Sequence, residues 1–190
     1  MSKWWYFILV LYMGASCATQ NGTGISGQPG TVRNGNEQKQ ADARRDSMNY
    51  EMALQALENR DFVVEADQLI FKRGRTAYVN SATNFVALQK DQAVIQVAPF
   101  RSAPGPNGVG GITVDGQVSN IQMKTDRKGR TYFSMNVMGS GVSATVDILL
   151  TKGSNKASVT VNPNFSSNRV TLNGVLVPPE RSTVFKGRSF

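Results

Sequence analysis

The only cysteine of the chain, Cys17, lies directly after three small residues that close a continuous apolar run. One lysine precedes the apolar residues 4–13, and the small residues 14–16 follow, which is the order of a secretory signal peptide. The apolar run is shorter than the ~20 residues that span a bilayer. Lipoprotein signal peptidases cut before a cysteine in this position, so we expect residues 1–16 to be removed and Cys17 to carry acyl chains as a lipid anchor. The alternative is an ordinary secretory signal, because lipoboxes usually carry leucine where this chain has Gly14.

Enzyme chemistry that depends on histidine or on a thiolate is excluded by composition. The chain contains no histidine, and the thiol of Cys17 is expected to be acylated. Histidine is the commonest general base and a common metal ligand, so zinc sites, Ser-His-Asp triads and Cys-His dyads are ruled out. We therefore predict no catalytic residue, no metal site and no cofactor.

A hydrolase that uses two carboxylates is the least favoured function, although it needs neither histidine nor cysteine. Asp91 and Asp126 lie in predicted turns, where a carboxylate commonly accepts backbone hydrogen bonds. Asp147 alternates with apolar residues, so its side chain is expected on the outer face of a strand. Asp115 precedes Gly116 and is interpreted as part of a turn. The remaining acidic candidates are Glu65, Asp67 and Glu180.

The elements that position these residues begin after a polar tether. Residues 17–36 are rich in Gly, Asn, Gln, Thr and Ser and are expected to be flexible, and residues 37–190 are expected to form a single domain. The domain opens with good helix formers and an apolar stripe that includes Met48, Met52 and Leu57, which predicts one amphipathic helix ending near Asn59.

From Phe62 onward the sequence is typical of strands and turns. Val146, Ile148 and Leu150 alternate with polar residues, as do the apolar residues of the later segments. A segment rich in proline and glycine excludes regular structure up to Ile112. About eight strands are expected, so the fold class is mainly β, an antiparallel meander that closes into a small barrel or folds over as a sandwich, with one N-terminal helix.

A small barrel of this kind either holds an apolar ligand or is filled by its own side chains. The aromatic residues Phe85, Phe100, Tyr132 and Phe133 are the candidate ligand contacts. Core filling is the alternative role for each of them, and it is the commoner role of aromatic residues in such barrels.

The chain is basic, with 21 Lys and Arg against 13 Asp and Glu and a net charge of +8. This balance favours contact with anionic surfaces such as phosphorylated head groups or acidic polymers. The basic residues are scattered in small groups, so solvated turns and protected strand edges are the commoner explanation. Nucleic acid is not an expected partner because the chain carries an export signal.

Five stretches of the sequence resemble an uncharacterised domain of unknown function found in exported lipoproteins of Bacteroides-type bacteria. The resemblance covers residues 46–190 and rests on Asn-Phe-Val at 84–86, Gly-Gly-Ile-Thr-x-x-Gly at 110–116 and Gly-x-Leu at 174–176. The stretches are FVVEADQLIF, NFVALQKDQAVIQV, GVGGITVDGQVSN, DRKGRTYFSMNVMG and VTLNGVLVPPERSTVFKG. The resemblance implies a compact, lipocalin-like β-barrel, and the family carries no established activity.

These observations predict a cell-envelope lipoprotein that is a binding or accessory module and not an enzyme. Its expected partners are the membrane, through the lipid on Cys17, and a small apolar or anionic ligand. The alternative is a domain with a solid core that contacts another envelope protein or a polymer. Surface-displayed lipoproteins of such bacteria often carry acidic residues after the cysteine, and ATQNG lacks them, so we expect a periplasm-facing anchor in the outer membrane.

Overall fold

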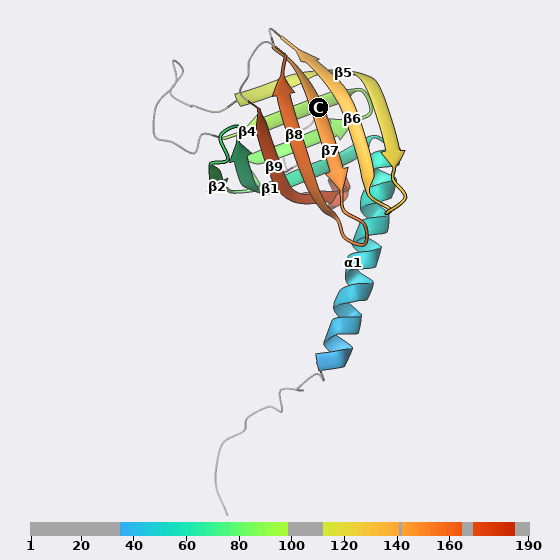
Figure 1. Ribbon diagram of the computed structural model, residues 1–190. Helices are drawn as coiled ribbons and strands as arrows, with labels where there is room; N and C mark the ends of the chain where they lie inside the picture. The colour runs from blue at the N-terminus through green and yellow to red at the C-terminus, as the bar shows by residue number, and fades with distance from the viewer. Residues whose placement is uncertain (1–34, 99–111, 141, 165–168, 185–190) are drawn as a thin grey trace, which may run out of the picture. The chain divides into compact units, whose positions relative to one another are not determined.

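The computed structural model describes residues 35–98, 112–140, 142–164 and 169–184. These residues form one helix, α1 (Gly35–Glu58), followed by nine strands and a single 3-10 turn, η1 (Pro179–Arg181) (Figure 1). The strands are β1 (Asp61–Phe71), β2 (Thr76–Tyr78), β3 (Asn84–Gln89), β4 (Gln92–Val97), β5 (Ile112–Thr125), β6 (Thr131–Gly139), β7 (Val142–Leu150), β8 (Lys156–Pro163) and β9 (Val170–Val177).

The sheet is antiparallel throughout and closes on itself. Its strand order is β2-β1-β3-β4-β5-β6-β7-β8-β9, and β1 also pairs with β9 along residues 63–71. Eight strands therefore form a barrel, while the three-residue β2 pairs only with residues 68–70 of β1. The predicted fold class, an antiparallel barrel with one N-terminal helix, is confirmed.

The interior of the barrel is occupied by side chains. Strand residues that point inward form one continuous buried cluster, because successive side chains on a strand point to opposite faces. Val146, Ile148 and Leu150 belong to this cluster, as their alternation predicted. The rings of Phe62 and Phe133 meet edge to face, with centroids 5.6 Å apart.

Only the last turns of α1 pack on the barrel. Ala53, Ala56 and Leu57 are buried in the same cluster as the strands. Met48 was expected on this packing face, but its side chain is 61% exposed. The expectation was wrong because Met48 and Leu57 lie on opposite sides of a helix with 3.6 residues per turn, and the side of Leu57 packs on the barrel. None of the helical segments in the described ranges has the length and hydropathy that crossing a bilayer requires.

The predicted turn at Asp115 is also wrong. Asp115 and Gly116 lie inside β5, where Asp115 pairs with Val94 of β4 and Gly116 pairs with Gly139 of β6. A side chain at Gly116 would come within 2.6 Å of the backbone nitrogen of Gly139, so the two glycines permit a close approach of the strands. This close pairing overrides the local turn preference of the Asp-Gly dipeptide.

A second apolar cluster lies on the outer face of the barrel, beneath the chain that follows β9. It is formed by Val63, Phe85, Ala87 and Val94, and Val177 and Val184 pack against it. The covering segment is held by Glu65, whose Oε1 accepts hydrogen bonds from the hydroxyl of Ser182 at 2.6 Å and from the backbone N–H of Thr183 at 2.7 Å. One carboxylate oxygen thus fixes the last described segment to β1.

Substitution of this carboxylate should loosen the segment. Glu65→Ala leaves the buried hydroxyl of Ser182 without its acceptor, so we expect the free energy of unfolding to fall by about 1–3 kcal/mol. Urea denaturation followed by far-UV circular dichroism measures the loss. Hydrogen exchange should show faster exchange at the amides of Thr183 and Val184, and unchanged exchange there would contradict the assignment.

Candidate functional site

Two of the candidate ligand contacts, Tyr132 and Phe133, line a groove over β5, β6 and β7, whereas Phe85 lies elsewhere. Phe133 is 2% exposed and points into the barrel, whereas Phe85 belongs to the outer apolar cluster. Tyr132 points outward and is 41% exposed, with the guanidinium of Arg130 5.7 Å from its ring centroid. Phe100 and Cys17 lie outside the described residues. A ligand-binding role for the four aromatic residues stays a prediction.

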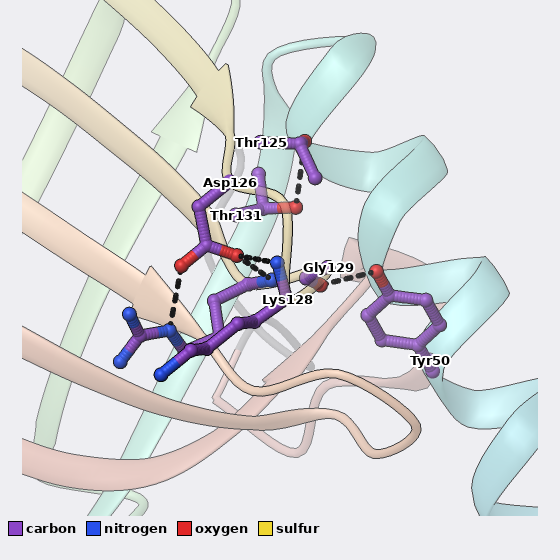
Figure 2. Close-up of polar contacts among 7 residues, drawn as sticks. Tyr50, Thr125, Asp126, Lys128, Gly129 and Thr131 are labelled. Carbon is purple, nitrogen blue, oxygen red and sulfur yellow. Dashed lines mark hydrogen bonds and ion pairs between the residues drawn. The ribbon is translucent and has the colours of Figure 1, made fainter.

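The acidic residue of the β5–β6 turn, Asp126, has a structural role, as its position predicted. Its Oδ1 accepts hydrogen bonds from the backbone N–H groups of Lys128 and Arg130, both at 2.9 Å, and its Oδ2 accepts one from Nε of Arg130 at 2.8 Å (Figure 2). These contacts, led by the backbone hydrogen bond from Arg130, hold the pKa of Asp126 below its ordinary value. The carboxylate organises the turn.

The other carboxylates expected on the surface are also found there. Asp147 points outward from β7 and accepts a hydrogen bond from the hydroxyl of Ser134 at 2.7 Å. Asp91 is exposed in the two-residue turn between β3 and β4. The groove that Asp147 lines has no second carboxylate among the described residues of its lining.

A pair of carboxylates does meet in a cleft of about 330 Å³ between the end of α1, the start of β1 and the chain that follows β9. We call this the α1–β9 cleft. The two acidic residues are Asp61 and Glu180. Its lining residues are Met52, Gln55, Ala56, Asn59, Asp61, Pro178, Pro179 and Glu180.

One oxygen of the Asp61 carboxylate lacks a hydrogen-bond partner in the described part of the chain. Its Oδ1 is inaccessible to solvent and has no hydrogen-bond partner among the described residues, although the residue as a whole is only partly buried. Desolvation, followed by the repulsion of Glu180, raises the pKa of Asp61, and the attraction of Lys90 opposes the rise. A positive group in the cleft would offset the repulsion between the carboxylates of Asp61 and Glu180.

The chemistry available in the α1–β9 cleft is recognition. Two carboxylates attract a cation, the amides of Gln55 and Asn59 offer further hydrogen bonds, and Met52 with the two prolines offers apolar surface. No group of three or more His, Cys, Asp or Glu side chains that could hold a metal ion occurs within the described ranges.

Sequence reasoning considered Glu180 but missed Asp61 and the cleft itself. Asp61 lies between the end of the helix and the first apolar residue of β1. Polar residues are common at such a position, so it carries no functional signal. No pattern in the sequence links this position to Glu180, more than a hundred residues later. Only the pairing of Val63 on β1 with Val177 on β9 brings the two carboxylates to one end of the barrel.

The raised pKa of Asp61 predicts a pH-dependent stability change. The folded state binds the Asp61 proton more tightly than the unfolded state, so this group lowers the free energy of unfolding as pH rises from its ordinary pKa of 3.8 through the raised value. Asp61→Asn should therefore be more stable than the unmodified protein at pH 7, and the difference should vanish below pH 3.8. Urea denaturation across this pH range measures it. Asp91→Asn, a change at an exposed turn, is the control and should show no such trend.

A smaller groove of about 150 Å³ lies over β5, β6 and β7. Two of the candidate ligand contacts, Tyr132 and Phe133, form part of its wall, and its polar lining residues are Gln122, Lys124, Ser134 and Asp147. In this groove the carboxylate of Asp147 is already hydrogen-bonded to Ser134, so the groove presents no unsatisfied group comparable with Asp61.

Comparison with known proteins agrees with the resemblance identified from the sequence. Residues 44–176 match the model of a domain of unknown function, DUF4251. The chain is also similar to the crystal structure of a DUF4251 family protein from Bacteroides eggerthii DSM 20697, with 47% sequence identity and a TM-score of 0.69, over 78% of this chain and 99% of that one. No curated protein matches the chain. The chain belongs to the DUF4251 family.

Proposed function

We propose that this protein is a non-catalytic accessory module of the cell envelope that contacts another envelope protein through its outer surface. The observation that carries the proposal is the filled interior of the barrel, where inward side chains from the strands and from α1 form one buried cluster. A barrel packed in this way leaves its outer surface as the place for recognition.

The α1–β9 cleft, which has two carboxylates in its lining, is the candidate place for such a contact. A lysine or arginine side chain of a partner would place its apolar stem against Met52 and the prolines and its charged end at Asp61 and Glu180. The cation would relieve the repulsion between the two carboxylates. The cleft therefore favours a partner with a protruding basic residue.

Native mass spectrometry tests whether the barrel interior holds a small molecule or is filled by side chains, which leaves the outer surface for recognition. The chain from Ala18 onward, produced in an envelope compartment and purified gently, should give the mass of the bare polypeptide. A denatured sample provides the reference mass. An excess mass that disappears on denaturation would identify a bound small molecule and would contradict the proposal.

Site-specific photocrosslinking in cells tests the cleft. A photoreactive residue at Gln55, an exposed position of the cleft, should give a discrete crosslinked product. Glu180→Lys should abolish this product because it places a positive charge where the partner's cation would bind. The same photoreactive residue at Lys72, an exposed position between β1 and β2, should give no such product. A product that survives Glu180→Lys would refute recognition of a cation in the cleft.

Anchoring at Cys17 is part of the proposal, with the outer membrane as the site and the periplasm as the side that the domain faces. It is supported by the small residues before Cys17 and by the polar segment after it. Cys17→Ala should abolish acylation and move the protein to the soluble fraction. Unchanged retention in the membrane fraction would contradict the anchor and leave the test of the cleft unaffected.

A further inference from the structure

Two turns that are separate in the sequence, together with the end of β5, bring five basic side chains to one end of the barrel. Lys152, in the β7–β8 turn, lies against Gly129 of the β5–β6 turn, since a Cβ at Gly129 would come within 2.7 Å of the Cδ of Lys152. Both turns lie at the end of the barrel from which α1 emerges (Figure 1). The five side chains, named here the basic rim, are those of Lys124, Arg127, Lys128, Arg130 and Lys152.

The positive charge of the basic rim is largely uncompensated. Its acidic neighbour in the turn, Asp126, is paired with Arg130 at 2.8 Å. Of the ion pairs within the described ranges, none involves the other four basic residues of the rim, and all four are exposed. The rim therefore offers four cationic groups to a partner.

The basic rim is held in place before any partner arrives. Asp126 fixes the backbone of the turn through the N–H groups of Lys128 and Arg130, and Gly129 adopts a φ of 77° that suits glycine. The hydroxyl of Tyr50 on α1 donates a hydrogen bond to the carbonyl of Gly129 at 3.2 Å (Figure 2). The rim and the helix thus form a fixed corner, and little backbone ordering is needed on binding.

We propose that the basic rim binds a flexible, carboxylate-bearing polysaccharide. The exposed cations favour an anionic partner, and the first turns of α1 extend past the rim on the same side (Figure 1). A flat anionic bilayer approaching the rim would meet this helix, whereas a flexible chain follows the corner between them. The site is separate from the α1–β9 cleft and does not depend on a protein partner there.

Binding of polygalacturonate oligomers to the chain from Ala18 onward tests the inference. We expect the apparent affinity to fall as the salt concentration rises, because exposed ion pairs are screened. Arg127→Gln/Lys128→Gln should weaken binding by about 10-fold, as expected for the loss of two exposed ion pairs. The matched control is Lys72→Gln/Arg73→Gln, which removes an adjacent lysine and arginine from the β1–β2 turn and should change affinity by less than about 2-fold.

Each contrary outcome overturns the inference. Equal losses in the two double variants would show that net charge, and not the basic rim, controls binding. Binding to phosphatidylglycerol vesicles but not to polygalacturonate at the same salt concentration would identify a membrane surface as the partner. Absence of binding to polygalacturonate at low salt would exclude this polymer class. Circular dichroism of both double variants should match the unmodified protein, since all four side chains are exposed.

Discussion

Phe133→Ala should lower the free energy of unfolding by about 3–5 kcal/mol, which is a large part of the stability of an ordinary domain. The ring of Phe133 is 2% exposed and packs edge to face on Phe62 across the barrel interior. Its removal forfeits the transfer free energy of the ring and leaves a cavity that the closed sheet cannot collapse to fill. Urea denaturation followed by far-UV circular dichroism measures the loss.

The neighbouring aromatic residue is the matched control for Phe133. Tyr132→Ala truncates a side chain that points to the opposite face and is 41% exposed, so we expect a change within about 0.5 kcal/mol. Phe133→Leu keeps most of the apolar volume and should cost less than Phe133→Ala, which keeps the test informative if the alanine variant does not fold. A small effect of Phe133→Ala would instead support the ligand-contact role predicted from the sequence.

The barrel was predictable because its signals are local and repeated. The alternation of Val146, Ile148 and Leu150 identifies the buried face of β7 without any knowledge of its neighbours. Glycine marks the turns, and Gly74 and Gly153 adopt the positive φ angles that favour this residue. The periodicity of apolar residues and the positions of turn residues agree along most of the chain. The type of each element and the buried face of each strand can therefore be predicted from sequence alone.

The features that sequence did not predict depend on contacts between distant segments. Met48 and Leu57 lie on opposite sides of the helix, and only contact with the barrel decides which of the two sides is buried. Asp115 has the local signal of a turn, but pairing of Gly116 with Gly139 makes this stretch part of a long strand. Asp61 and Glu180 line the same cleft only because the barrel closes through the pairing of β1 with β9. No short sequence motif predicts that closure.

Closure depends on a glycine in β9. Gly174 pairs with Ala66 of β1 on one side and with Ala157 of β8 on the other. A Cβ at Gly174 would overlap the carbonyl oxygen of Glu65 and lie 2.7 Å from the Cα of Ala66, and both of these are backbone atoms that cannot move aside by changing rotamer. The register of β1 against β9 shifts between Ala66 and Gln68, directly beside this contact. The irregular pairing therefore requires a residue without a side chain.

Gly174→Ala should lower the free energy of unfolding by about 3 kcal/mol or more, the upper end of the cost of overpacking, because β9 must separate from β1 to admit the methyl group. Hydrogen exchange should locate the damage, with faster exchange at the amides of β1 and β9 than at those of β6 and β7. Gly35→Ala is the control, since a Cβ at this first residue of α1 meets no atom within 4 Å and should change stability by less than about 0.5 kcal/mol. If Gly174→Ala were as stable as Gly35→Ala, the β1–β9 seam would have room for a side chain, and Gly174 would have to serve something other than closure of the barrel.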